Sequence, residues 1–237
     1  MMDKRALQNN LFLVQEKIKA AALRVGRDPN EIKLVVVTKG RSIEEMQALY
    51  EIGAREFGEN RIEQATIKIK DLSEYKDIKW HMIGHIQSRK SKDVCENFDY
   101  VHSLDSKKLA ARLDKFAQEK NRKLPVLFQF NVSGEETKSG WNVEDESDLK
   151  KIQSEINFVR ILENLQIQGL MTMAPYDPVA ENARLFFRRL SNYRNHLDTI
   201  YPEMGLNELS MGMSGDFEVA VEEGATILRI GSAIFDY

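Results

Sequence analysis

Eight short segments typical of strands alternate with helix-length segments along this chain, and this alternation limits the fold more than any other feature. We predict strands at residues 34–37, 56–58, 80–83, 100–103, 126–131, 167–171, 208–211 and 227–230. Helices are predicted at 42–52, 62–72, 87–95, 106–119, 148–162, 179–197 and 217–223. The run at 34–37 is apolar on both faces, as in a parallel strand that helices cover on both sides. Eight such steps predict an α/β fold, a single (β/α)₈ TIM barrel, with a doubly wound open sheet as the alternative.

An additional helix is predicted before the first strand, within residues 1–27. Its apolar residues recur at spacings of three and four and form one stripe, made of Leu7, Leu11, Val14, Ile18, Ala22 and Val25. Asp28, Pro29 and Asn30 then end the helix. No segment has the composition of a flexible linker. We therefore expect residues 1–237 to form a single domain, with residues 1–27 packed on the barrel.

The composition argues against several classes of partner. The 34 basic and 37 acidic residues nearly cancel, so charge gives no reason to expect binding to nucleic acid or to a membrane surface. Cys95 is the single cysteine, which excludes a disulfide framework within the chain. The apolar runs are too short for a membrane span, and the amino terminus lacks the apolar core of a secretory signal. A cytoplasmic protein is expected.

Lys39 follows the first predicted strand and is the first candidate for chemistry. In a barrel of this kind the functional groups lie at the carboxyl ends of the strands. Strand alternation places Lys39 on the same face as Val35 and Val37. An amine at the edge of an apolar interior would be partly desolvated, which favours the neutral nucleophile that forms Schiff bases. The alternative interpretation is a lysine that extends from the strand end into solvent.

Two loops after the last two strands predict a phosphate site. Residues 210–216 contain two glycines and two serines, and Ser214 is placed as the N-cap of the next helix, where an anion is favoured. Residues 229–233 follow the eighth strand, where Gly231 permits close approach of the backbone and Ser232 offers a hydroxyl. Barrels often bind phosphate with these two loops.

Arg229 shares a face with Gly231, so its side chain is expected to point into the barrel. A guanidinium buried without an acceptor is very costly. Either a carboxylate on a neighbouring strand or a heteroatom of a ligand would satisfy it. Because the first and eighth strands are neighbours in a closed barrel, Lys39 and the phosphate loops could hold one small molecule. An aldehyde that also carries a phosphate suggests pyridoxal 5′-phosphate (PLP).

Eight segments spread over nearly the whole chain match a known family in order: 36–39, 55–60, 80–87, 131–135, 138–140, 169–174, 210–214 and 229–232. Together they resemble the PLP homeostasis family (YggS/PROSC), which is similar to the barrel domain of alanine racemase. The resemblance implies a PLP barrel of fold type III without the C-terminal β domain of the racemase.

The resemblance also implies roles for individual residues. Lys39 would form the Schiff base with PLP, and Arg229 would face the pyridine nitrogen. Because a guanidinium only donates hydrogen bonds, that nitrogen would stay unprotonated and the ring would be a poorer electron sink. The remaining residues expected to bind the cofactor are Asn60, His85, Met171, Ser210, Ser214, Gly231 and Ser232.

The function implied is that of a non-catalytic protein that binds, buffers and supplies PLP, with PLP-dependent apoenzymes as candidate recipients. A PLP-dependent amino acid racemase is the alternative, and a barrel enzyme acting on a sugar phosphate through Lys39 is a third hypothesis. Racemisation needs two bases. In the racemase fold the second is a tyrosine of a β-rich domain of the partner subunit, whereas this sequence ends at Tyr237, soon after the eighth strand. We therefore expect a monomer with no catalytic residues.

A metal site is not expected. His81 and His85 are four residues apart, but they flank a strand end and its loop rather than one face of a helix.

Overall fold

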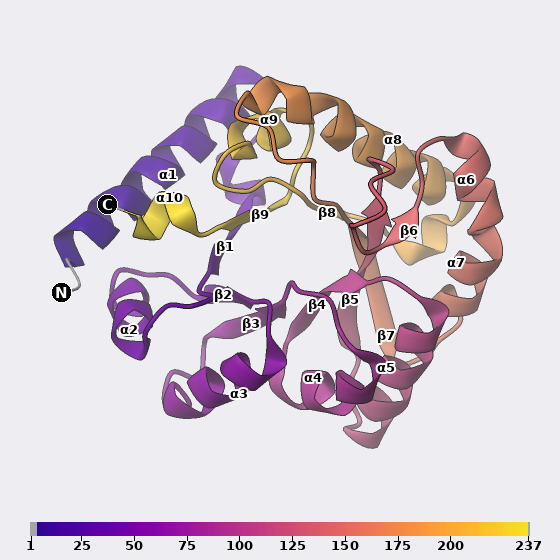
Figure 1. Cartoon of the computed structure of the whole chain (residues 1–237), viewed down its shortest axis with the longest axis horizontal. Coiled ribbons are helices and arrows are strands. Elements are labelled where there is room, and N and C mark those ends of the chain that lie inside the picture. The colour runs from indigo at the N-terminus through magenta and orange to yellow at the C-terminus, as the bar shows by residue number, and fades with distance from the viewer. Residues whose placement is uncertain (1–3, 237) are drawn as a thin grey trace.

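Eight parallel strands close into a ring, with helices packed around its outside (Figure 1). In this computed structural model, which describes residues 4–236, each strand of the ring pairs with the next and the last pairs with the first. The strands are β1 (Lys33–Val37), β2 (Glu56–Glu59), β3 (Lys79–Met82), β4 (Tyr100–Leu104), β5 (Leu124–Asn131), β7 (Leu165–Met171), β8 (Glu208–Ser210) and β9 (Ile227–Ile230). The predicted (β/α)₈ barrel is confirmed, and the open sheet is wrong.

A ninth, two-residue strand lies outside the ring. This strand, β6 (Trp141–Asn142), pairs in parallel with the end of β5, and Val143 N donates to Asn131 O at 3.0 Å. It was not predicted, because two residues carry no periodic pattern. Its effect is to fold the long segment after β5 back onto the barrel.

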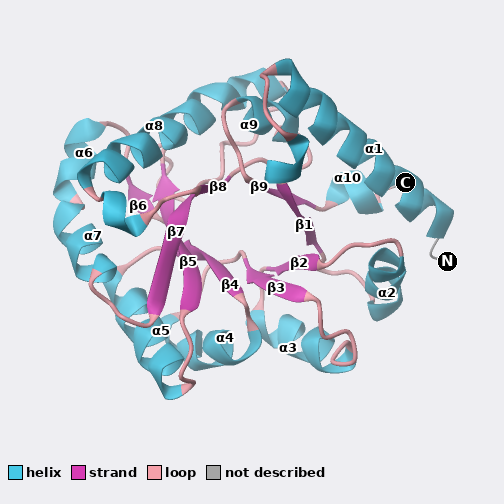
Figure 2. Ribbon diagram, turned by 180° about the vertical axis from the view of Figure 1, so that it is seen from behind, coloured by secondary structure: helices cyan, strands magenta, loops and turns pink. Residues whose placement is uncertain are grey.

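Helices surround the strands on all sides (Figure 2). They are α1 (Lys4–Arg24), α2 (Ile43–Glu51), α3 (Ile62–Asp71), α4 (Ser91–Asn97), α5 (Lys107–Glu119), α6 (Glu146–Lys151), α7 (Gln153–Arg160), α8 (Arg184–Ile200), α9 (Phe217–Glu222) and α10 (Ser232–Phe235). Short 3₁₀ turns occupy Pro29–Glu31, Ser88–Lys90, Ala180–Ala183 and Pro202–Met204. The predicted helix at 148–162 is two helices that meet at Ile152, and α10 was not predicted. Within residues 4–236, no helix is both long enough and apolar enough to cross a membrane.

Helix α1 packs along α9 and α10 (Figure 1). It buries the predicted stripe except for Val25, which lies beyond the last turn and is exposed. Asn10 Nδ2 also donates to Ile234 O at 3.1 Å. The first helix therefore covers the end of the chain as well as the barrel.

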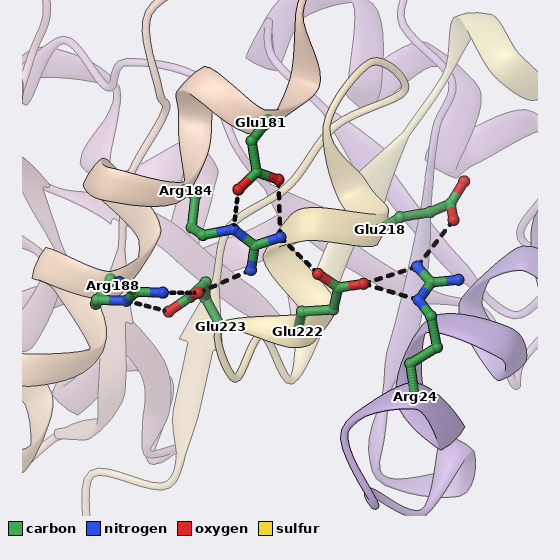
Figure 3. A network of polar contacts seen from close by, with 7 residues as sticks. All are labelled: Arg24, Glu181, Arg184, Arg188, Glu218, Glu222 and Glu223. Atoms are coloured by element: carbon green, nitrogen blue, oxygen red, sulfur yellow. Dashed lines mark hydrogen bonds and ion pairs between the residues drawn. The ribbon is translucent and has the colours of Figure 1, made fainter.

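A network of charges links α1 to α9 and to the start of α8 on the outside of the barrel (Figure 3). Glu222 lies between Arg24, at 2.8 Å, and Arg184, at 2.6 Å. The remaining members are Glu181, Arg188, Glu218 and Glu223. These partly exposed pairs connect three helices that are distant in sequence.

The inside of the ring combines apolar and polar side chains. A small apolar cluster contains Val35, Tyr100, Leu127, Met171 and Ile227. Beside it, fully or nearly buried, lie the polar side chains of His81, His102, Ser210 and Arg229. Most of the core lies elsewhere, between the strands and the surrounding helices.

Candidate functional site

A cavity of about 590 Å³ opens at the carboxyl ends of the strands. This volume is in the range of pockets that hold small cofactors. Of the nine residues predicted to bind a cofactor, seven line this cavity: Lys39, Asn60, His85, Ser214, Arg229, Gly231 and Ser232. The structure therefore brings together residues from the first, second, third, seventh and eighth βα loops.

Lys39 lies in a turn two residues beyond the end of β1, and its side chain is exposed. The expected partial desolvation is not found, because the strand ends at Val37 and the lysine lies past the apolar interior. Its amine makes no hydrogen bond or ion pair within residues 4–236. The amine is thus free to react with a molecule in the cavity.

The backbone next to Lys39 is held by a buried ion pair. Lys68 Nζ donates to Glu59 Oε1 at 2.7 Å and to Thr38 O at 2.7 Å. Thr38 Oγ1 donates to the same Glu59 oxygen at 2.6 Å. All three residues are buried. The turn that carries Lys39 is consequently fixed while its side chain is not.

Helix α2 begins directly after this turn with a capping box. Ser42 Oγ accepts from Glu45 N at 3.3 Å, and Glu45 Oε2 accepts from Ser42 N at 2.7 Å. These two bonds satisfy amides that a helix start leaves without partners. They fix the direction in which the chain leaves the cavity.

Arg229 is buried, with 4% of its surface exposed, and lines the floor of the cavity. It donates through Nη1 to Ser210 Oγ and through Nη2 to Thr172 O at 2.9 Å. No carboxylate within residues 4–236 forms an ion pair with it, so of the two acceptors considered from the sequence the carboxylate is not found, and a hydroxyl and a backbone carbonyl accept instead. Burial lowers the pKa of Arg229 to about 10, against the weaker influence of Asp216, and the guanidinium stays charged at neutral pH. The cavity thus has a cation at its floor with three of five N–H groups unused.

The two predicted phosphate loops meet at Ser214. Its Oγ accepts from Gly231 N at 3.3 Å and from Ala233 N at 3.1 Å. The prediction that Ser214 caps the following helix is wrong: Asp216 precedes α9, and its Oδ1 accepts from Met213 N at 2.6 Å. The serine instead joins its loop to the turn after β9. A phosphate held there would accept from the Ser214 hydroxyl, whose proton these two bonds leave free.

Gly231 allows β9 to end close to β1. A Cβ atom added at Gly231 would lie 3.2 Å from Val37 O and 3.3 Å from Val37 Cβ. Such contacts are tighter than most that real side chains make. The absence of a side chain therefore lets the phosphate loops approach the strand that carries Lys39.

Asn60 and His85 lie on the side of the cavity formed by β2 and β3. The backbone of Asn60 packs directly on Gly84, where an added Cβ would be 2.2 Å from Asn60 O. His85 is at the rim, where its ring Nδ1 is 2.9 Å from Asp105 Oδ2. His81 points into the barrel, so the two histidines diverge. Within residues 4–236, no group of three His, Cys, Asp or Glu side chains is arranged to hold a metal ion.

Met171 and Ser210 do not line the cavity. Met171 is fully buried in the apolar cluster inside the ring, and the cavity wall is formed instead by Met173, two residues further on. Ser210 lies beneath the cavity, bonded to Arg229. Both residues lie below the residues that line the cavity, so neither would contact a ligand directly.

The cavity residues that were not predicted from the sequence include Arg41, Gln129 and Tyr176. Strand alternation could have found Gln129, which is two residues before Asn131 and whose Nε2 donates to Ser139 O at 2.8 Å. Arg41 is in the same loop as Lys39 and pairs with Asp236 at 2.7 Å. Tyr176, at the rim, is 95% exposed and no pattern marks it.

The sequence matches the family described as "Alanine racemase, N-terminal domain" over residues 3–237. A relative from Aquifex aeolicus is 40% identical over 225 residues and covers 95% of both chains. Another, from Synechocystis sp., is 39% identical over 207 residues, which are 87% of this chain and 92% of the relative. Both relatives carry the name pyridoxal phosphate homeostasis protein.

Solved structures share the fold. PipY from Synechococcus elongatus PCC7942, determined with PLP bound, superposes with a TM-score of 0.79 and is 35% identical over 94% of this chain and 99% of its own. An alanine racemase from Clostridium difficile 630 has a TM-score of 0.69 at 16% identity, over 98% of this chain and 57% of its own. At that identity the racemase shows the common barrel alone.

Proposed function

Because the chain belongs to the alanine racemase N-terminal-domain family and, within it, to the PLP homeostasis proteins, we propose that it binds PLP and acts as a non-catalytic carrier. In this role it would bind, buffer and supply the cofactor. PLP-dependent apoenzymes are the proposed recipients, in the cytoplasm, and the carrier is proposed to act as a monomer.

One observation carries the proposal: a free lysine amine, a buried guanidinium and a two-loop donor cluster surround a single cavity. These groups correspond to the aldehyde, the ring nitrogen and the phosphate of PLP. The amine belongs to Lys39, the guanidinium to Arg229, and the donors to the Ser214 loop and the turn after β9. The residues present therefore fit the cofactor.

Lys39 supplies the covalent attachment in this proposal. When bound, PLP supplies an aldehyde, with which the amine condenses to a C=N bond while one water leaves. The turn fixed by Lys68 and Glu59 places the amine, and the exposure of its side chain leaves the linkage open to exchange with another amine. Easy exchange is what a protein that hands over its cofactor requires.

Arg229 disfavours catalysis in this proposal. Its N–H groups can donate to the ring nitrogen but cannot accept a proton from it. An unprotonated ring withdraws electrons poorly, so a carbanion next to the bound substrate would gain little stabilisation. The name of the relatives that this chain matches along 92–95% of their length supports the same conclusion.

Borohydride reduction followed by peptide mass spectrometry tests the attachment. We expect the purified protein, loaded with PLP and reduced, to carry one adduct, on the peptide that contains Lys39. The variant Lys39→Ala should carry none, whereas Lys70→Ala, which removes an exposed lysine on α3, should behave as the wild type. An adduct exclusively on another lysine would contradict the assignment, and failure to load PLP would favour the sugar-phosphate hypothesis.

A turnover assay separates the carrier from the racemase. The PLP-loaded protein should not interconvert L- and D-amino acids above the rate of free PLP, and it should restore activity to a PLP-dependent apoenzyme. Robust racemisation of any amino acid would show an enzyme instead. Light scattering on the same sample tests the proposed monomer.

A further inference from the structure

A continuous chain of hydrogen bonds crosses the inside of the barrel from the cavity to its opposite end. Arg229 Nη1 bonds to Ser210 Oγ, which is 2.8 Å from His102 Nδ1. His102 Nε2 is 2.9 Å from His81 Nδ1, and His81 Nε2 is 2.6 Å from Glu56 Oε2. The five residues come from β9, β8, β4, β3 and β2. Nothing in the proposed function uses the two histidines or the glutamate.

The two ends of the chain together determine the direction of its bonds, because the guanidinium only donates and the ionised Glu56 carboxylate only accepts. His81 Nε2 therefore donates to Glu56, and with both imidazoles neutral Ser210 Oγ accepts from Arg229 and donates to His102 Nδ1. His102 then carries its proton on Nε2 and donates to His81 Nδ1. His81 in turn carries its proton on Nε2 and donates to the Glu56 carboxylate. Both imidazoles are neutral in this arrangement, and all four of their ring nitrogens have a partner.

The surroundings favour this neutral arrangement at neutral pH. Burial, helped by the charges of Arg229 and Lys33, lowers the pKa of His102 well below its usual value. Desolvation alone would raise the pKa of Glu56, but the hydrogen bond from His81 and the charges of Lys33 and Lys79 outweigh it and lower that pKa.

The groups that face the chain are few. Tyr100 stacks on His81, with ring centroids 5.3 Å apart, and it donates to Gln168. Its hydroxyl is affected by Glu208 and Glu56, and burial raises its pKa, so it stays neutral. Glu56 is the member that meets solvent, with 27% of its side chain exposed at the amino-terminal end of β2, whereas His81 is 1% exposed. Solvent therefore reaches the chain at Glu56, whereas the histidine in its middle is shielded from it.

One added proton reverses the chain. With a proton on both ring nitrogens of His81, its Nδ1 donates to His102 Nε2, and His102 is then in its other neutral tautomer, with the proton on Nδ1. That nitrogen donates to Ser210 Oγ, which accepts from both His102 and Arg229. The hydroxyl proton of Ser210 no longer points to His102. The two states differ by one proton, bound by His81, and by the direction of the Ser210 hydroxyl beneath the cavity.

We propose that His81 and His102 are positioning residues that transmit the protonation state of the Glu56–His81 pair to Ser210 and Arg229, and thereby adjust how the cavity holds its ligand. The part that concerns PLP rests on the proposed function. The part that concerns the direction of the chain stands without it. Protonation at the Glu56 end of the barrel would thus change the hydrogen bonds of Ser210 and Arg229 beneath the cavity.

Histidine ¹⁵N NMR of the protein without PLP tests the direction of the chain. At pH 7.5 both interior histidines should be neutral Nε2–H tautomers. As the pH falls, His81 should become charged and His102 should change to the Nδ1–H tautomer at the same midpoint. An Nδ1–H tautomer of either residue at pH 7.5, or a His102 that does not change when His81 does, would overturn the proposal. His196→Gln, which removes an exposed histidine on α8, serves for assignment and as a control.

The variant Glu56→Gln tests the entry point. It keeps the shape of the side chain and removes the negative charge that favours protonated His81. The midpoint of the tautomer change should move down by about one pH unit or more, the effect of losing an opposite charge at hydrogen-bond distance. An unchanged midpoint would contradict the assignment. Because Glu56 is partly exposed at the start of its strand, Glu56→Gln should fold, and it tests the chain without replacing a fully buried histidine.

The PLP dissociation constant measured against pH tests the coupling. Its profile in Glu56→Gln should shift in the same direction and by the same amount as the tautomer midpoint, although Glu56 lies at the opposite end of the barrel from the cavity. A profile identical to the wild type would show that the chain does not reach the ligand. If the wild type does not bind PLP, the proposed function fails, and the NMR measurement still decides the direction of the chain.

Discussion

The two sides of the cavity are held in place by different means. On the side of Lys39, buried charged side chains fix the backbone, because Lys68 and Glu59 bond to Thr38 and to each other. On the side of the phosphate loops, backbone packing does this, through the close approach of Gly231 to Val37 and the amides bonded to Ser214. A reacting lysine needs a fixed backbone and a mobile side chain, whereas an anion site needs hydrogen-bond donors in fixed positions. This difference explains why side-chain charges hold the Lys39 turn and backbone packing holds the phosphate loops.

Breaking the charged side should have the largest effect. Lys68→Met leaves Glu59 buried without its cation, which typically costs about 3–5 kcal/mol of unfolding free energy. Denaturant unfolding measures this loss. Lys70→Met, on an exposed position of the same helix, is the matched control and should change the free energy of unfolding little. If both variants were equally stable, the ion pair would not be what holds the Lys39 turn.

Breaking the backbone-built side should alter binding more than stability. Ser214→Ala removes the hydroxyl that joins the two loops, and we expect PLP affinity to fall about tenfold or more, the effect of one charge-assisted hydrogen bond. Pyridoxal, which lacks the phosphate, should bind the variant and the wild type alike. Ser73→Ala, at an exposed position, is the control. Equal losses for both ligands would show that these loops do not hold the phosphate.

Acidification should lower the stability of the protein through His102, which is buried inside the barrel. His102 is neutral when folded because its pKa is lowered, so below its usual value of 6.5 the unfolded chain binds more protons and is favoured. The unfolding free energy should therefore fall by up to about 1.4 kcal/mol per pH unit below pH 6.5. His102→Gln should flatten this slope, whereas His196→Gln should not. A slope that His102→Gln leaves unchanged would assign the effect to other groups.

The smallest effect is expected far from the cavity. Arg24→Ala removes a half-exposed member of the charge network on α1 (Figure 3), and ion pairs that solvent screens in this way contribute little to stability. The thermal midpoint should shift slightly and PLP affinity should not change. A large loss of affinity would mean that α1 contributes to the site.

The strands were predictable because their signal is local. A run such as Leu34–Val37 contains its own pattern, and the structure extends it by one residue to Lys33. The lysine environment was not predictable in the same way. Whether Lys39 is desolvated depends on where the pairing of β1 ends, and Val37 pairs with Gly58 as its last partner.

The wrong prediction for Ser214 and the unpredicted contact between His81 and His102 have a common cause. Ser214 and Asp216 both precede α9, and only the contact with the turn after β9 decides what the serine does. His81 and His102 each lie in a strand with no sign of the other, because their meeting depends on the register of β3 against β4. Contacts between elements distant in sequence leave no periodic pattern to find.

The pairing of β1 with β9 ties ligand binding to the completion of folding. Lys33 pairs with Ile227, so the two halves of the cavity come from opposite ends of the folded sequence and meet when the ring closes. A partly folded chain would have the amine or the anion loops, but not both. A ligand that contacts both the amine and the anion loops binds only when the ring is closed, so its binding free energy stabilises the closed ring. In the protein without ligand, the pairing of β1 with β9 should accordingly be the first part of the ring to open.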